Sequence, residues 1–204
     1  MFEDGKYAEA LALFEQLVVM TEAEHGPEHP KVGDALNDLA QVLGYLGNYP
    51  LARSTAERGL KINEAALGPN HLEVARGLYE LARVLKEQNE LDAAQSLLER
   101  ALAIREATLG ANDTVVATTL QQLATVFQKQ GELPSAARRL KRALIIKEAV
   151  HGPQSREVAS TLLALASVVQ DQGDLKTART MLERVLSINE VTLGRNNPAL
   201  AARP

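Results

Sequence analysis

The sequence predicts an all-α fold in which antiparallel helical hairpins stack into a right-handed α-solenoid. Three observations lead to this prediction: two series of glycines that share one period, helical spacing of the apolar residues between them, and a high content of helix-forming residues. Hydrophobic residues make up 46% of the chain and aromatic residues only 3%, so we expect an aliphatic core.

Two series of turn residues set the period of the repeat. Glycine and asparagine accept the left-handed backbone conformation that ends a helix. Two such residues in every period therefore predict two helix ends, and so one helical hairpin per repeat. The spacing within each series is 42 residues, and the members are Gly26, Gly68, Gly110, Gly152 and Gly194 in one and Gly5, Gly47, Asn89, Gly131 and Gly173 in the other.

Apolar residues between these turns recur with helical spacing, as in Val32, Leu36 and Leu39. We name the first helix of each hairpin A and the second B. One array is expected over 1–204, without strands. It consists of an unpaired B helix at 5–25, four complete repeats at 29–67, 71–109, 113–151 and 155–193, and the start of a truncated further repeat at 197–204. The A helices are expected at 29–46, 71–88, 113–130 and 155–172, and the paired B helices at 49–67, 91–109, 133–151 and 175–193.

The helix starts carry capping residues. His29, His71, Asp113 and Ser155 lie at one recurring position before the A helices, and Pro30 follows the first of them. Small residues recur inside the helices, where they let two helix backbones approach closely. They are Ala40, Ala82, Ala124 and Ala166 in the A helices and Ala52, Ala94, Ala136 and Ala178 in the B helices.

Charge and residue usage argue against several classes of function. A net charge of −4 offers no long-range attraction to nucleic acid or anionic membranes, and no apolar run is long enough to span a bilayer. The chain has no cysteine, which excludes disulfides and thiolate metal sites, and its start lacks a signal peptide pattern. These features favour a cytoplasmic protein. No catalytic set, phosphate-binding loop or cofactor motif is present, so we expect neither an enzyme nor a cofactor.

The four histidines all fall between a B helix and the next A helix, so they are expected to cap helices or lie in loops. The segment His25-Gly26-Pro27-Glu28-His29 has a spacing that suggests a metal site. Gly-Pro breaks the helix that such a pair of ligands needs, so no metal site is expected.

Several segments resemble a known repeat. Arg100-Ala101-Leu102-Ala103-Ile104-Arg105-Glu106, then Leu109-Gly110 and Leu120-Gln121-Gln122-Leu123-Ala124, are similar to the 42-residue tetratricopeptide repeat (TPR) of kinesin light chains and nephrocystin-3-like proteins. The resemblance extends from Gly5 to about Pro198. It implies a TPR superhelix that binds proteins, with a concave groove lined by the A helices.

This sequence differs from the kinesin light chain family at the binding groove. In that family, a Leu-Asn-Asn-Leu-Ala segment holds an extended peptide backbone. Of the asparagines in that segment only Asn37 is present here, and the carboxylate clamp of shorter repeats is not assembled. The partner specificity of the family therefore does not carry over. The matching segments read Leu36-Asn37-Asp38-Leu39-Ala40, Leu78-Tyr79-Glu80-Leu81-Ala82, Leu120-Gln121-Gln122-Leu123-Ala124 and Leu162-Leu163-Ala164-Leu165-Ala166.

Candidate binding residues lie on the A helices off the apolar stripe. Tyr and Arg are common interface anchors, and Gln can hydrogen-bond an extended peptide. We predict that the groove contacts a protein or peptide partner through Asn37, Asp38, Gln41, Tyr45, Arg76, Tyr79, Arg83, Gln121, Gln122, Thr125 and Lys129. The alternative is that these residues form an ordinary solvated surface.

Two sets of charged residues on the B helices are assigned structural roles. A glutamate recurs near the end of every B helix, where the helix dipole disfavours it, so we expect it to accept hydrogen bonds from a neighbouring hairpin. The basic run Arg138-Arg139-Leu140-Lys141-Arg142, with Lys147, is expected on the outer face, in solvent. The recurring glutamates are Glu22, Glu64, Glu106, Glu148 and Glu190.

The leading function is a protein-binding scaffold or adaptor. The alternatives are a self-assembling module that associates through open solenoid ends, and a positioning domain of a larger multidomain enzyme. The first helix motivates the self-assembly alternative, because it lacks an A partner. We predict that a second copy, in a weak homo-oligomer, or the tail containing Leu200 covers its Phe14 side.

Overall fold

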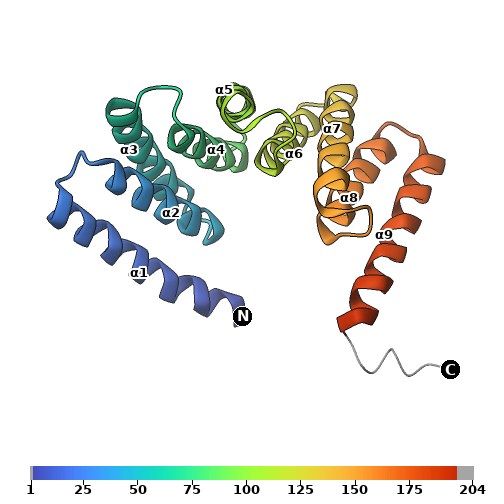
Figure 1. Ribbon diagram of the computed structural model, residues 1–204, viewed down its shortest axis with the longest axis horizontal. Helices are drawn as coiled ribbons and strands as arrows, with labels where there is room; N and C mark the ends of the chain where they lie inside the picture. The colour runs from blue at the N-terminus through green and yellow to red at the C-terminus, as the bar shows by residue number, and fades with distance from the viewer. Residues whose placement is uncertain (1, 197–204) are drawn as a thin grey trace. The chain divides into compact units, whose positions relative to one another are not determined.

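The computed structural model describes residues 2–196 and, in that part of the chain, contains nine α-helices and no strand (Figure 1). Side chains are described from residue 9 to residue 192. The helices are α1 (Phe2–His25), α2 (Pro30–Tyr45), α3 (Tyr49–Leu67), α4 (Leu72–Glu87), α5 (Leu91–Leu109), α6 (Thr114–Lys129), α7 (Leu133–His151), α8 (Arg156–Asp171) and α9 (Leu175–Asn196).

The chain divides into two compact units, residues 1–108 and 109–204, which we describe separately. The boundary falls at the end of α5, between the second and third predicted repeats. The first unit thus holds the unpaired B helix and two hairpins, and the second unit holds the other two hairpins. That all repeats form one continuous array stays a prediction.

The predicted helix boundaries between residues 29 and 172 agree with the structure to within one residue. The outer ends differ: α1 begins at Phe2 rather than near Gly5, and α9 continues to Asn196 rather than ending near residue 193. Gly5 and Gly194 therefore lie inside helices. A glycine ends a helix where the chain must turn, and no described helix precedes α1 or follows α9. The predicted further repeat at 197–204 lies outside the described residues.

The remaining turn residues behave as predicted. The seven other glycines of the two series have φ between 75° and 89°. Asn89, which stands at a glycine position of the second series, has φ 64°. Asparagine tolerates this conformation better than most residues, so the turn between α4 and α5 keeps its geometry without glycine.

The predicted caps of the A helices are also present. The side chains of His29, His71, Asp113 and Ser155 each accept a hydrogen bond from a backbone N–H in the first turn of the helix that follows. Pro30 occupies the first turn of α2, where its missing N–H breaks no helical bond. Two of the four histidines thus act as caps.

The core of the first unit lies between successive helices. Val32, Leu36 and Leu39 of α2 pack with Val18 of α1 and Ile62 of α3. A second cluster joins α4 to α5 and contains Val74, Ala75, Leu78, Ala101 and Ile104. Each A helix is therefore bound to the B helix of its own hairpin by aliphatic packing.

The second unit repeats this arrangement with α8 and α9. Val158, Ala159 and Leu162 of α8 pack against Val185 and Ile188 of α9. Leu120 of α6 is also fully buried. Because the clusters use equivalent positions 42 residues or a multiple apart, the same packing scheme holds in both units.

The packing of α1 contradicts one prediction. Phe14 is partly buried and packs against the cluster that joins α1, α2 and α3, so the Phe14 side is not the open side of this helix. The open side carries Leu13, Leu17 and Met20. Phe14 and Val18 lie on the face that meets the following A helix, whereas the open residues lie on the face where the A helix of the same hairpin would pack. Leu200, the proposed alternative cover, lies outside the described residues.

A close helix contact in the first hairpin leads to a stability prediction. A Cβ atom added at Gly59 would lie 2.9 Å from the carbonyl oxygen of Gly33, which is too close. Gly59→Ala should therefore lower the free energy of unfolding by about 1–2 kcal/mol, because overpacking outweighs the gain in helix propensity. Urea unfolding followed by circular dichroism measures the change.

Gly44→Ala is the matched control, since a Cβ at this helical glycine would meet nothing within 4 Å. It should raise the free energy of unfolding by up to about 1 kcal/mol through helix propensity alone. Equal effects of the two substitutions would contradict the proposed close contact.

Candidate functional site: the polar faces of the A helices

Each A helix has a buried apolar stripe and a polar face. In the first unit, Arg76 of α4 connects the polar faces of α2 and α4. It donates to Asp38 Oδ1 at 2.6 Å, to Glu73 Oε2 at 2.7 Å and to the Asp34 carbonyl oxygen at 3.2 Å. The Asp34 carboxylate lies 3.6 Å away as well, so three carboxylates surround one guanidinium group. Burial and the neighbouring Glu73 carboxylate raise the pKa of Asp34.

A second cluster lies further along the same two helices. Arg83 of α4 donates to Glu80 Oε2 at 2.7 Å, and Gln41 of α2 donates to Glu80 Oε1 at 3.2 Å. The guanidinium of Arg83 also lies over the ring of Tyr45, 4.9 Å from its centre. Glu80 is buried, and this burial raises the pKa of its carboxyl group. Tyr45 is exposed, so the cluster presents an aromatic ring supported by a cation.

The B helices also contribute to these clusters. Arg105 of α5 lies over the ring of Tyr79, 4.7 Å from its centre, and Asn63 of α3 donates to Asp34 Oδ1 at 3.2 Å. Both B-helix side chains are buried. Neither residue was predicted as part of the site, although Asn63, Arg105 and Lys147 are spaced 42 residues apart at a polar position within an otherwise apolar face.

One predicted contact residue is inaccessible. Asn37 is only 1% exposed, so its side chain cannot meet a partner directly. A Cβ added at Gly59 or at Gly77 would lie 3.1 Å or 3.3 Å from Asn37 Oδ1. The amide therefore fills the space that these two glycines leave. Neither amide atom has a hydrogen-bond partner among the described residues.

The second unit has a different polar face, formed mainly by amides and hydroxyl groups. Gln121 of α6 donates to Thr161 Oγ1 of α8 at 3.1 Å, and its own Oε1 accepts a bond from Lys147 Nζ of α7 at 2.5 Å. Gln128 of α6 donates to Ser167 Oγ and Asp171 Oδ2 of α8. These bonds join three helices at the polar surface.

The other predicted residues of α6 lie on the same surface. Gln122 and Thr125 are half-buried, and Lys129 is exposed in the last turn of the helix. The hydroxyl group of Thr125 donates to the Gln121 carbonyl oxygen at 3.1 Å. The structure thus groups these residues with Gln121. Their contact with a partner stays a prediction.

Lys147 contradicts its predicted location on the outer face. It is only 7% exposed, and its ammonium group meets Gln121 on the side of the A helices. Among the described residues no carboxylate forms an ion pair with it. Burial lowers the pKa of Lys147, and the more distant Glu157 opposes this shift. An amide partner compensates a buried charge less well than a carboxylate.

Lys147→Met should therefore raise the free energy of unfolding at pH 7 by about 1 kcal/mol, because it removes a buried charge and keeps the packing. Since the folded-state pKa of Lys147 is depressed, wild-type stability should rise as the pH increases from that pKa towards 10.5. The advantage of the variant should then shrink over the same range. Thermal unfolding from pH 7 to pH 10.5 tests both; a constant difference would contradict them.

Two of the five recurring glutamates of the B helices, Glu64 and Glu148, accept hydrogen bonds from the following hairpin, as predicted. Glu64 pairs with Arg100 at 2.6 Å, and Glu148 pairs with Arg184 at 2.5 Å. Arg100 also donates to the carbonyl oxygen of Pro69, and Arg184 to that of Pro153. Each arginine therefore ties a B helix to the preceding B helix and its loop. Glu22 and Arg58 form the same pair at 2.6 Å.

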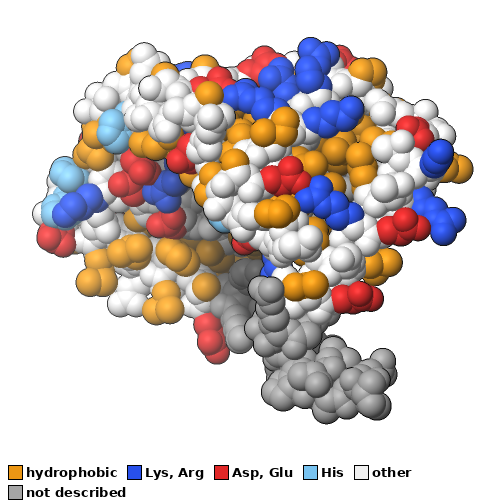
Figure 2. Space-filling view, turned by 45° about the vertical axis from the view of Figure 1, so that its right-hand side comes forward, with side chains coloured by type: hydrophobic (Ala, Val, Ile, Leu, Met, Phe, Trp, Pro, Cys, Tyr) orange, Lys and Arg blue, Asp and Glu red, His pale blue; other side chains and the backbone are white. Residues whose placement is uncertain are grey.

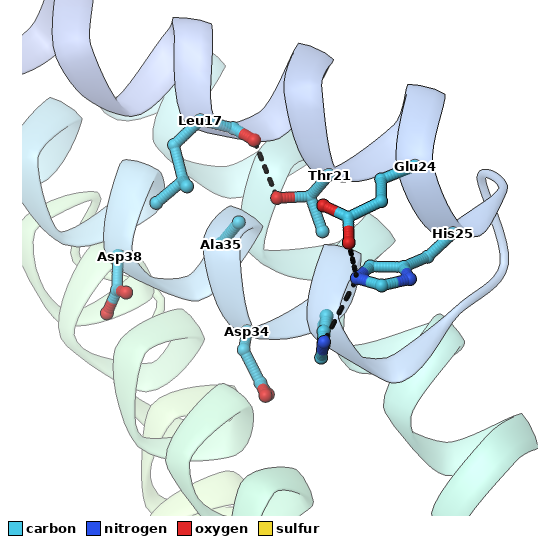
Figure 3. Close-up of a pocket in the computed structure, with 8 residues that line it drawn as sticks. Leu17, Thr21, Glu24, His25, Asp34, Ala35 and Asp38 are labelled. Carbon is cyan, nitrogen blue, oxygen red and sulfur yellow. Dashed lines mark hydrogen bonds and ion pairs between the residues drawn. The ribbon is translucent and has the colours of Figure 1, made fainter.

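A hollow of about 320 Å³ lies between α1 and α2, beside the polar face of the first unit (Figure 3). His25 contacts Glu24 at 3.4 Å and Lys31 at 3.0 Å, and its ring stacks on that of His29. Asp34 and Asp38 lie on the α2 side of the hollow. Among the described residues there is no group of three or more side chains suited to hold a metal ion.

The surface mixes charge and apolar groups. In Figure 2, acidic and basic side chains alternate over the upper part of the visible face, and hydrophobic side chains gather at the lower left, where Figure 1 places α1. Of the helices described, none combines the length and the apolar character needed to cross a bilayer.

The sequence matches a known family of repeat proteins. The model of the tetratricopeptide repeat matches residues 1–65, 46–107, 76–149 and 115–190. This chain belongs to the tetratricopeptide repeat family. The predicted fold class, an all-α TPR solenoid, is thereby confirmed. Among curated proteins, none matches the sequence.

Solved TPR structures are similar to this one. A Podosopora anserina protein of kinesin light chain type with nearly identical TPR-like repeats is 25% identical, with a TM-score of 0.75 over 93% of this chain and 90% of that one. BtubC (BKLC) from P. vanneervenii is 21% identical, with a TM-score of 0.81 over 94% of this TPR chain and 76% of its own. MamA is 17% identical, with a TM-score of 0.62 over 93% and 92%. The resemblance to kinesin light chain repeats thus holds for the fold.

Proposed function

We propose that this TPR protein is a non-catalytic, cytoplasmic scaffold that binds an extended peptide or helix of a partner protein along the polar faces of its A helices. The observation that carries this proposal is the second cluster on α2 and α4, which consists of Tyr45, Arg83, Glu80 and Gln41. In this cluster, Arg83 lies over the exposed ring of Tyr45 and is itself held by Glu80.

A preorganised anchor favours binding because little side-chain freedom is lost in the complex. Tyrosine and arginine are also the residues that most often dominate interface energies. In the second unit, Gln122 and Thr125 lie beside the bonded pair of Gln121 and Lys147. Amides of this kind can bond to an extended backbone. Each unit thus offers a polar surface suited to peptide binding.

Site-specific photo-crosslinking tests the proposal. Benzoylphenylalanine is placed at Tyr45 or Gln122 on the A helices, or at the exposed Glu99 and Lys141 on the B helices as controls. Cross-linked partners from the native host are identified by mass spectrometry. We expect products from the A-helix positions and few from the B-helix positions.

The purified partner then allows a binding measurement. Tyr45→Ala should weaken its affinity by about tenfold. Leu51→Ala changes an exposed apolar residue on α3 and should leave the affinity unchanged. Equal cross-linking from both sets of positions, or an unchanged affinity of the Tyr45 variant, would reject binding on the A-helix face.

A further inference from the structure

A second hollow of the first unit lies between the B helices α1 and α3, with α2 at its base. Its volume is about 440 Å³, within the range of about 300–1,000 Å³ that is typical of ligand pockets. The structure describes all three helices that form it, so its walls are complete whatever precedes α1. We call it the α1–α3 hollow. It is lined by Glu15, Val18, Val19, Leu36, Leu39, Ser54, Thr55 and Arg58.

The later repeats show what occupies the equivalent place between successive B helices. Leu60 of α3 and Leu97 of α5 pack against the cluster that joins α4 to α5. In the second unit, Leu144 of α7 and Met181 of α9 pack in the same way against the cluster of α8 and α9. Two long apolar side chains therefore close this place in each unit.

The α1–α3 hollow exists because both of these positions carry shorter side chains. By the 42-residue period, Val18 stands at the position of Leu60, and Thr55 stands at the position of Leu97. Both residues are only 8% exposed, so the space is open although its walls are buried. Leu36 and Leu39 of α2 are also buried. The missing volume is therefore that of a leucine or methionine side chain above an apolar base.

Thr55 also offers a hydroxyl group that its own helix does not use. A threonine inside a helix can donate to the backbone carbonyl four residues before it, as Thr21 does to Leu17 at 2.7 Å. For Thr55 that carbonyl belongs to Leu51, and Ser54 Oγ donates to it at 3.1 Å. Among the described residues the Thr55 hydroxyl has no hydrogen-bond partner. It is therefore available to a group that enters the hollow.

The rim of the hollow carries one uncompensated charge. Of the described residues that line it, Glu15 and Arg58 are charged. Arg58 pairs with Glu22 at 2.6 Å, whereas Glu15 forms no ion pair with any described side chain. One carboxylate is thus in excess among these three groups, which favours a basic group on an approaching ligand.

We propose that the α1–α3 hollow binds a peptide segment of a partner protein through a leucine or methionine side chain. The peptide backbone bonds to the Thr55 hydroxyl, and a neighbouring lysine or arginine of the peptide pairs with Glu15. Apolar contact with Leu36 and Leu39 supplies most of the binding energy, and the charge adds selectivity. This site is separate from the polar faces of the A helices and does not rest on the function proposed for them.

Methyl NMR of the intact protein, with three capped dipeptides as probes, tests this inference. Acetyl-Leu-Lys-amide carries the anchor and the charge, acetyl-Ala-Lys-amide lacks the anchor, and acetyl-Leu-Glu-amide reverses the charge. The methyl signals of Val18, Val19 and Leu39 report on the hollow, and buried Leu140 of the second unit is the reference. We expect saturable shifts at the hollow alone. The affinity for the first peptide should be about tenfold higher than for the second and about fivefold higher than for the third.

Four protein variants assign the parts of the site. Thr55→Leu restores the longer side chain of the later repeats and should weaken binding at least about tenfold by filling the space. Thr55→Val keeps the shape, removes the hydroxyl and should weaken binding about threefold. Glu15→Gln should bind the lysine and glutamate peptides equally but still prefer leucine to alanine. Thr180→Leu, at an exposed threonine of α9, is the matched control and should bind like the wild type.

Several results would overturn the proposal. No saturable shift at the hollow, equal affinities for the leucine and alanine peptides, or unchanged binding by Thr55→Leu would show that no apolar anchor enters it. Equal affinities of the wild type for the lysine and glutamate peptides would refute the role of Glu15. Shifts at the hollow that grow with protein concentration, without peptide, would assign it to a second copy. If Thr55→Leu does not fold, as circular dichroism will show, the three peptides and Glu15→Gln still decide.

Discussion

Replacing Leu120 by alanine should lower the free energy of unfolding by about 2–5 kcal/mol. Leu120 is fully buried in α6, and the smaller side chain would leave a cavity that the close-packed helices cannot fill. Chemical denaturation with the wild-type protein measured in parallel gives the difference.

Leu163→Ala makes the same chemical change on α8, in the same unit. This leucine is 47% exposed, so its replacement should change the free energy of unfolding by no more than about 0.5 kcal/mol. Similar losses for the two variants would mean that burial in this unit is not distributed as the structure shows.

Arg83→Ala should lower the free energy of unfolding by about 2–3 kcal/mol, because it leaves the buried Glu80 carboxylate without its cation. Gln41 still donates one hydrogen bond to Glu80, which limits the loss. The double variant Arg83→Ala, Glu80→Gln should recover most of the stability, since the neutral amide needs no counterion. Thermal unfolding of the four proteins in this cycle provides the measurement.

The pH dependence gives an independent check on the same pair. Arg83 lowers the pKa of Glu80 against the larger effect of burial, so its removal raises that pKa further. A carboxyl group with a raised folded-state pKa stabilises the fold less as the pH rises from its unfolded value, near 4.5, through the folded value. The deficit of Arg83→Ala should therefore be largest at neutral pH and vanish below about pH 4.5. A deficit that persists at low pH would rule out the unpaired carboxylate as its cause.

The loss of stability expected for Arg83→Ala also affects how partner binding is tested. A partner that loses affinity for Arg83→Ala could be responding to a destabilised fold rather than to a missing contact. The double variant separates the two effects, because it restores stability without restoring the guanidinium group above Tyr45.

The sequence alone determined the hairpins and their boundaries. Turns depend on local backbone preference, so glycine or asparagine at a fixed spacing specifies where each internal helix ends. The apolar stripes depend on the helical period, so residues such as Val32 and Leu36 were correctly assigned to the core. The bonds of Glu64 and Glu148 to a following hairpin were also predicted, because a buried or disfavoured charge requires a partner.

Only the tertiary structure decided which polar residues reach the surface. Asn37 and Tyr79 hold equivalent positions, yet glycines at 59 and 77 let neighbouring backbones enclose the asparagine. Lys147 and Arg105 turn toward the A helices because their position faces the seam between helices, which a charge pattern along one helix does not reveal. The exposure of Met20 has the same origin: burial belongs to pairs of helices, and α1 carries the residues of a pair without its partner among the described helices.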